Sequence, residues 1–184
     1  MAWLQSRKFA TKDGTVITIA SPGIGDAAEL TGVVRLIMAK SEHLHTQADE
    51  FTISLEQQEK RIQRLLDHPD YLIIVVKAAG KIVGTLDFMC GNRRKSAHHG
   101  SFGMSLHPEF QGLGIGRAML ESLLEWATAN PRLEAVRLQV HAKNEKALAL
   151  YRSVGFQEEG REHDAVKTGD RVYDHVVLMS KTVG

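Results

Sequence analysis

Three glycines at alternate positions mark the point where an extended segment gives way to an amphipathic helix. The stretch Gln111-Gly-Leu-Gly-Ile-Gly-Arg117 follows the predicted strand 97–106 and leads into a helix predicted over 115–129. The N–H groups in the first turn of a helix lack partners within it, and the helix macrodipole adds partial positive charge there. Because glycine lets the backbone approach an anion closely, the sequence predicts a pyrophosphate-binding loop.

Two common phosphate-binding motifs do not fit this loop. Counted from Gly112, the third glycine of a dinucleotide-binding fingerprint is replaced by Arg117, and counted from Gly114 it is replaced by Met119. No Gly-Lys-Ser/Thr follows, which excludes a Walker loop. Short glycine motifs are weakly specific, so on the glycines alone a turn without a ligand remains an equal alternative.

The whole chain, residues 1–184, is predicted to form one α/β domain. Hairpin strands come first and βαβ-type crossovers follow, which predicts a mixed, mostly antiparallel sheet with helices on both faces. Asp26 is a possible N-cap for the first helix. We expect strands at 15–19, 71–76, 82–89, 97–106, 135–140 and 171–179, a further extended segment from Phe156, and helices at 30–38, 55–66, 115–129 and 144–154.

Composition narrows the classes of partner. Hydrophobic residues make up 43% of the chain and charged residues 24%, values typical of folded globular proteins. A formal net charge of +1 gives no electrostatic argument for a nucleic acid or a membrane as partner.

The first eight residues lack the order of a signal peptide and no apolar run is long enough to span a bilayer, so we expect a cytoplasmic protein. The lone Cys90 ends an apolar run and is interpreted as a core residue rather than a reactive thiol.

Two motifs resemble those of the GNAT superfamily of N-acetyltransferases. Gln111-Gly-Leu-Gly-Ile-Gly116 is similar to the family signature Gln/Arg-x-x-Gly-x-Gly/Ala, and His107-Pro-Glu-Phe110 resembles its usual lead-in. Asn144-Glu-Lys-Ala-Leu-Ala-Leu-Tyr-Arg-Ser-Val-Gly-Phe156 resembles the second hallmark, Asn-x-x-Ala-x-x-x-Tyr-x-x-x-Gly-Phe. The motifs occur in the family's order, separated by one helix and one strand, and the resemblance extends from about Val16 to Met179.

The resemblance implies acetyl-CoA as co-substrate and no metal. It assigns the pyrophosphate to the backbone of the glycine loop, the pantetheine arm to the end of strand 97–106, and protonation of the departing thiolate to Tyr151. Tyr151 could instead be a packing residue, and Asn144 could cap its helix as well as contact the cofactor. The cofactor-binding positions implied are Met104, Ser105, Leu106, Gln111, Gly112, Leu113, Gly114, Ile115, Gly116, Arg117, Asn144, Ala147 and Tyr151.

Two glycines inside the strand 97–106 bear on how the pantetheine arm could reach the end of this strand. Gly100 and Gly103 weaken the strand, and such glycines often mark a bulge or the close approach of a ligand to the backbone. We expect a bulge at Gly103 to separate two strands and to open the slot for the pantetheine arm.

This chain lacks the Glu that many relatives have at positions where it could remove the proton of the acceptor amine. Many relatives have a Glu on the strand before the glycine loop or on the strand before Asn144. The first position in this chain is around Ser101, and the second is Gln139. Neither Ser101 nor Gln139 can act as a carboxylate base, and Glu109 is predicted to be a solvated loop residue. The histidines His98, His99 and His141 lie near these positions, but removal of the proton through ordered water is the expected route.

The acceptor is less specified than the cofactor. Segment 160–179 resembles two GNAT groups, one acting on protein N-termini and the other on small amines and amino-acid-like antibiotics. Tyr173 and Asp174 either line the acceptor site or belong to an edge strand. We expect an N-acetyltransferase acting on a primary amine; the alternatives are a protein N-terminal acetyltransferase, an enzyme using another acyl-CoA, or a non-catalytic acyl-CoA-binding module. Relatives are frequently dimers, and strand 172–179 offers an edge, so a homodimer is expected.

Overall fold

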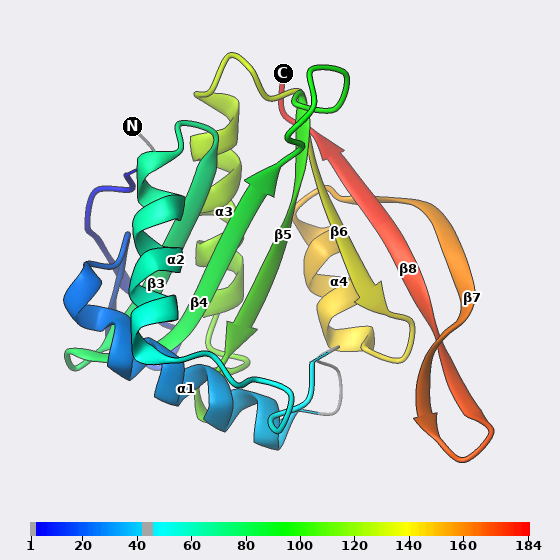
Figure 1. Cartoon of the computed structure of the whole chain (residues 1–184), viewed down its shortest axis with the longest axis horizontal. Coiled ribbons are helices and arrows are strands. Elements are labelled where there is room, and N and C mark those ends of the chain that lie inside the picture. Colours follow the sequence, from blue (N-terminus) through cyan, green and yellow to red (C-terminus); the bar gives the residue numbers. More distant parts are fainter. Residues whose placement is uncertain (1–2, 42–45) are drawn as a thin grey trace.

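The strands form one twisted sheet in the computed structural model, which describes residues 3–41 and 46–184. Within these ranges, eight strands are arranged in the order β1-β2-β3-β4-β5-β6-β8-β7 (Figure 1). Every neighbouring pair is antiparallel except β5 and β6. The strands are β1 (Arg7–Ala10), β2 (Val16–Ala20), β3 (Tyr71–Ala78), β4 (Lys81–Cys90), β5 (His99–Leu106), β6 (Ala135–His141), β7 (Gln157–Gly169) and β8 (Val172–Thr182).

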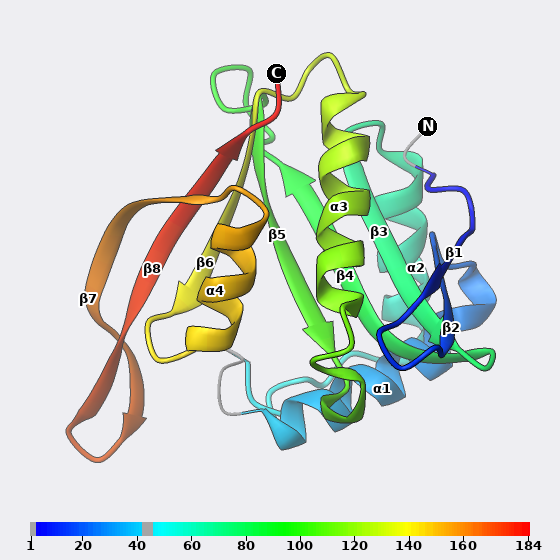
Figure 2. The ribbon, with the colours of Figure 1, turned by 180° about the vertical axis from the view of Figure 1, so that it is seen from behind.

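Helices cover both faces of this sheet. The helices are α1 (Ala27–Lys40), α2 (Leu55–Asp67), α3 (Ile115–Thr128) and α4 (Glu145–Ser153). The first two helices of the chain, labelled α1 and α2, lie on the face seen in front in Figure 1, and α3 and α4 lie on the face seen in front in Figure 2. This arrangement confirms the predicted mixed, mostly antiparallel sheet with helices on both faces.

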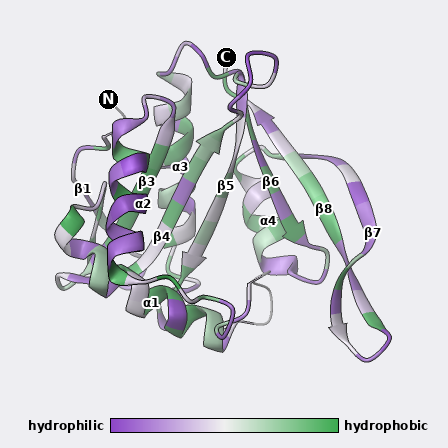
Figure 3. Ribbon diagram, viewed as in Figure 1, coloured by the Kyte–Doolittle hydropathy of each residue, from purple (hydrophilic) through white to green (hydrophobic). Residues whose placement is uncertain are grey.

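Each helical layer closes its own apolar core. Side chains of α1 and α2 pack on β3 and β4 in a smaller cluster that includes Leu30, Ile62 and Ile73. The larger cluster lies under α3 and α4 and includes Met119 and Leu148. Figure 3 shows the hydrophilic residues of α2 on its outward side, as expected for a helix with one buried stripe.

The parallel pair β5–β6 is joined only at its beginning. The paired positions are His99 with Ala135, Gly100 with Val136, and Ser101 with Arg137. Beyond Ser101 the two strands diverge, while β5 remains paired with β4 as far as Leu106. The divergence leaves one edge of β5 open along residues 102–106.

Four sequence-based expectations need correction. The edge strand expected over residues 172–179 is wrong, because β8 lies between β6 and β7 and pairs with both from Val176 onward. The β4–β5 register is continuous through Gly103, so the expected bulge there is wrong; divergence from β6 opens the slot without it. Asp26 does precede α1, but its carboxylate makes no capping bond to that helix. It accepts from the Gly23 N–H at 2.9 Å and pairs with Lys77 Nζ at 2.6 Å. The strand β1 was not predicted.

Within the described residues, no helix is both long enough and apolar enough to cross a membrane.

Candidate active site

A cavity of about 1100 Å³ lies where β5 and β6 diverge. Residues 102–106 of β5 line one side and residues 139–141 of β6 line another. The glycine loop, the first turns of α4 and the last part of α1 complete the wall. The two motifs singled out from the sequence, which are separated by one helix and one strand, therefore face the same space.

The three glycines of the loop serve two different purposes. Gly112 (φ +78°) and Gly114 (φ +90°) lie in the left-handed region, where a side chain costs free energy. Gly114 immediately precedes α3, so the loop delivers the free N–H groups of that helix to the cavity. Gly116 lies at a close helix contact: a Cβ atom there would be 3.0 Å from the Leu150 side chain of α4, which would have to shift slightly.

Hydrogen bonds attach the loop to its neighbours. Gln111 Nε2 donates to the Leu106 carbonyl at 3.2 Å, which joins the loop to the end of β5. Arg117 Nη2 donates to Ser153 Oγ at 2.8 Å, which joins the first turn of α3 to the end of α4. The loop is therefore held in place before any ligand arrives.

Most of the cofactor positions expected from the sequence line the cavity, and two do not. Ile115 is 1% exposed and packs into the larger core, and Leu113 packs against the same core. The side chains of these two residues therefore belong to the core rather than to the cavity wall. The predicted positions found in the wall are Met104, Ser105, Leu106, Gln111, Gly112, Gly114, Gly116, Arg117, Asn144, Ala147 and Tyr151.

Tyr151 combines a place in the wall with a place in the core. Its side chain is buried and makes edge contacts with Phe102 and Phe156, with ring centroids 5.9 and 6.0 Å apart. Burial raises the pKa of the Tyr151 hydroxyl to about 12. The phenol therefore stays protonated at neutral pH, in the form that can donate a proton.

Asn144 also has a structural role. It is the N-cap of α4, and its Oδ1 accepts from the Ala147 N–H at 3.1 Å. The capping alternative considered from the sequence is thus present, and Asn144 lines the cavity at the same time.

The structure separates the three candidate histidines. His99 lies at the far end of β5, where burial and the nearby Arg137 charge lower its pKa. His98 contacts the His99 ring edge-on, with centroids 4.8 Å apart. Neither is in the cavity wall, whereas His141 is. The His141 side chain is buried, and its Nδ1 lies 3.7 Å from Oδ2 of the buried Asp174.

The remaining acceptor-side candidates lie at the surface or behind the wall. Ser101 and Glu109 are exposed, and Gln139 is an exposed residue on the cavity wall. Tyr173 is exposed, and neither Tyr173 nor Asp174 is among the described residues that line the cavity. The Lys143 Nζ donates to the Tyr173 carbonyl at 3.4 Å, which connects the β7–β8 hairpin to the rim.

Sequence reasoning missed several residues of the wall, and three of them lie far from both motifs in the sequence. Ile37 belongs to α1, Ser41 is the residue that follows α1, and Lys12 belongs to the turn between β1 and β2. No local motif marks these positions, because they reach the cavity only through the tertiary fold.

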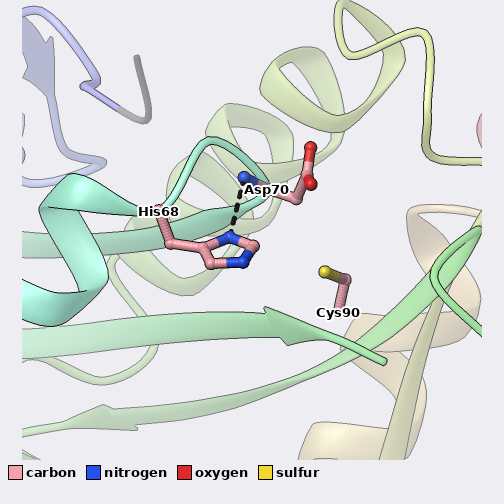
Figure 4. A group of neighbouring side chains, drawn as sticks. All are labelled: His68, Asp70 and Cys90. Carbon is pink, nitrogen blue, oxygen red and sulfur yellow. Dashed lines mark hydrogen bonds between the residues drawn. The ribbon is translucent and has the colours of Figure 1, made fainter. Parts of the chain in front are cut away.

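A second group of polar side chains lies at the opposite end of the sheet (Figure 4). Candidate ligand atoms of His68, Asp70 and Cys90 lie within 4.8 Å of one another. His68 Nδ1 accepts from the Asp70 N–H at 3.1 Å, and the Asp70 carboxylate contacts Asn130 Nδ2 and Arg132 Nη2 at 3.1 and 3.0 Å. These contacts tie the α2–β3 turn to the connection between α3 and β6. Burial raises the pKa of the Cys90 thiol, in keeping with a core residue.

Known proteins resemble this chain in sequence and in fold. N-alpha-acetyltransferase RimI of Mycobacterium tuberculosis is 35% identical over 97 residues, which are 53% of this chain and 59% of the relative. The acetyltransferase of the GNAT family from Streptococcus pneumoniae superposes with a TM-score of 0.87 at 24% identity, covering 91% of this chain and 99% of that one. The yncA structure from Salmonella typhimurium with its cofactor acetyl-CoA gives 0.78 at 19% identity, covering 91% and 94%.

The family assignment rests on more than half of the chain. The sequence model of the acetyltransferase (GNAT) family matches residues 37–156, which include the glycine loop, β6 and the whole second motif. The matched stretch ends at Phe156, the last residue of that motif, and it contains most of the cavity wall. The chain belongs to the acetyltransferase (GNAT) family.

Proposed function

We propose that the chain is an N-acetyltransferase that transfers the acetyl group of acetyl-CoA to a primary amine of a small molecule or peptide. The observation that carries this proposal is the cavity that joins the glycine loop, the open edge of β5 and the Tyr151 side chain. These parts match the three regions of acetyl-CoA in order: the pyrophosphate, the pantetheine arm and the thioester. Membership of the family supports the same reaction.

The backbone provides most of the cofactor site. The first-turn N–H groups of α3 receive the pyrophosphate, because the macrodipole and the free donors both favour an anion there. The open edge of β5 at Met104, Ser105 and Leu106 pairs with the amide groups of the pantetheine arm as an added strand would. The contacts with the pyrophosphate and with the pantetheine arm are both made by backbone groups, so they depend on few particular side chains.

The chemistry is direct attack by the amine on the thioester carbonyl. A tetrahedral centre forms, its oxygen is stabilised by backbone N–H groups, and collapse breaks the C–S bond and expels the thiolate of CoA. Tyr151 donates its proton to that sulfur and regains one from water afterwards. Burial raises its pKa to about 12, which keeps the phenol protonated until the thiolate leaves. Water in the cavity takes the proton from the attacking amine.

The acceptor is proposed at the α1 side of the cavity. Ile37 and Ser41 line the wall there, and His141 and Val176 line it from β6 and β8. A second candidate acceptor is a protein N-terminus, which is favoured by the 35% identity to an N-alpha-acetyltransferase. The matched stretch covers 59% of that relative, so its substrate is carried over only as a proposal.

Release of free thiol from acetyl-CoA, followed with a panel of amines, tests the proposal. The panel contains polyamines, amino acids, aminoglycosides and short peptides with free N-termini, and the same panel with propionyl-CoA tests the use of another acyl group. Turnover on small amines supports the main proposal, and turnover confined to peptides supports the second candidate. A folded protein that binds acetyl-CoA without turnover on any amine would instead be an acyl-CoA-binding module.

A further inference from the structure

Lys12 reaches the glycine loop from a part of the chain that lies outside the family match, which begins at residue 37. Its backbone N–H donates to the Leu113 carbonyl at 3.2 Å. Its side chain lines the cavity beside Gly112 and Gly114, and its Cγ lies 4.0 Å from the place that a Cβ on Gly114 would occupy. A flexible cationic side chain thus lies against the backbone that receives the pyrophosphate.

The turn that carries Lys12 is well defined. The Asp13 carboxylate accepts from the Thr11 hydroxyl and, at 3.1 Å, from the Thr15 N–H. Gly14 has a φ of +86°, and its N–H donates to the Thr11 carbonyl at 3.0 Å. These bonds close the turn from within and fix the direction in which Lys12 leaves it.

The β1–β2 hairpin is also attached to α3 at a second point. The Arg7 guanidinium makes a two-pronged ion pair with the Glu125 carboxylate, and the Nη2–Oε1 contact is 3.0 Å. Figure 2 shows the hairpin beside α3. Contacts at Arg7 and at Lys12 therefore hold the hairpin along the helix whose N-terminus faces the cavity.

The other cations of the wall have different surroundings. Arg117 donates to Ser153 and lies 3.5 Å from Glu121, and Lys143 donates to the Tyr173 carbonyl. Lys146 lies on α4 and, within the described residues, makes no ion pair or side-chain hydrogen bond, but it has no contact with the glycine loop such as Lys12 makes. For Lys12, the described part of the chain holds no carboxylate in ion-pair contact and no side-chain hydrogen bond.

We propose that Lys12 binds the pyrophosphate of acetyl-CoA, so that the β1–β2 hairpin completes the anion site begun by α3. This inference rests on the proposed function. An ammonium group adds a full positive charge to the partial charge of the helix N-terminus, and charge-assisted hydrogen bonds to phosphate are stronger than neutral ones. A lysine serves here as a point charge that reaches a phosphate oxygen from a fixed backbone.

Calorimetry with CoA tests this without relying on any acceptor. We expect Lys12→Gln to weaken CoA binding by about 10-fold or more, the range for one charge-assisted contact, and Lys12→Arg to retain most of the affinity. Lys8→Gln is the matched control, because Lys8 is an exposed residue on β1 of the same hairpin. In the acetyl-transfer assay, Lys12→Gln should raise KM for acetyl-CoA and leave KM for S-acetylpantetheine, which has no phosphate, unchanged.

Four outcomes would overturn the inference. Equal CoA affinity of Lys12→Gln and the parent protein removes Lys12 from the site while leaving the proposed function intact. An equal loss with S-acetylpantetheine shows a structural effect rather than a phosphate contact. A loss that disappears with 3′-dephospho-CoA assigns Lys12 to the 3′-phosphate instead. If the parent protein itself does not bind CoA, the proposed function fails together with this inference.

Discussion

Tyr151 is the residue on which the packing and catalytic interpretations make opposite predictions. Tyr151→Phe keeps the ring and its contacts with Phe102 and Phe156 but removes the proton that the thiolate receives. We expect kcat to fall by about 10- to 10,000-fold, the range for one acid–base group, with little change in CoA affinity. Steady-state kinetics and calorimetry on the same preparation measure both quantities. An unchanged kcat with a good acceptor would falsify the catalytic role and leave Tyr151 as a packing residue.

The pH dependence distinguishes the two routes of proton removal. The acid works when protonated, and burial raises the Tyr151 pKa to about 12, so its activity is present at neutral pH and lost only as pH rises through that value. With water as the proton acceptor, log(kcat/KM) should rise with pH and follow the pKa of the amine used. If His141 is the base, a separate limb that belongs to the enzyme should appear, and its position should not move when the amine is changed.

Two substitutions identify the origin of such a limb. His141→Asn should abolish it if His141 is the base, and His99→Gln is the control, because His99 lies outside the cavity wall. A limb that disappears only in His141→Asn, and stays in place when the amine is changed, would overturn the water route.

At the level of single residues, the sequence predicts the positions that belong to contiguous motifs. Gly112, Gly114, Asn144 and Tyr151 all line the cavity, because each is fixed relative to a helix terminus or helix face that its own motif creates. Lys12 was not predictable, since its approach to the glycine loop depends on how a distant hairpin packs along α3.

At the level of elements, the sequence predicts those with strong periodicity. The helix predicted over 115–129 is found at Ile115–Thr128, and the strand predicted over 135–140 at Ala135–His141. By contrast, β1 has four residues and one of them, Phe9, is half-buried, so no alternating pattern reveals it. The opening of the cavity was also beyond local reasoning, because it arises where the pairing of β5 with β6 ends.

The glycine loop connects an element boundary to binding. Gly114→Val places a β-branched residue at a φ of +90°, which strains the backbone by about 1–3 kcal/mol and moves the first N–H groups of α3. We expect CoA affinity measured by calorimetry to fall at least about 10-fold. Gly32→Ala is the control, because Gly32 lies within α1 with open space around it and an alanine there should stabilise the protein slightly. Full affinity in a folded Gly114→Val protein would refute the pyrophosphate assignment.

On the scale of the whole molecule, we propose a homodimer. The hairpin β7–β8 forms one border of the sheet, and its turn end carries the exposed apolar side chains Val172 and Tyr173. Burial of this surface in a partner copy would remove apolar area from water. Light scattering at micromolar concentration should give the mass of two chains, and Val172→Lys should shift it towards that of one. A single-chain mass for the parent protein contradicts the proposal.

The contacts of Asp70 hold together segments that are far apart in the chain, and their removal should be asymmetric. Arg132→Ala leaves the buried Asp70 carboxylate with Asn130 as its side-chain partner, whereas Asp70→Asn releases an Arg132 side chain that is already 62% exposed. Stranding a buried charge costs more than freeing an exposed one, so we expect Arg132→Ala to lower the free energy of unfolding by about 1–3 kcal/mol and Asp70→Asn by less.

Urea denaturation of the two single variants and the double variant measures this asymmetry as a cycle. The double variant should be more stable than the sum of the single losses predicts, because once the carboxylate is gone Arg132 has no buried charge to neutralise. Lys60→Ala, which breaks an exposed pair with Glu56, is the control and should change stability by no more than about 0.5 kcal/mol. Additive losses in the cycle would show that Arg132 and Asp70 stabilise the fold independently, and the tie between the α2–β3 turn and the α3–β6 connection would have to be sought in the packing around them.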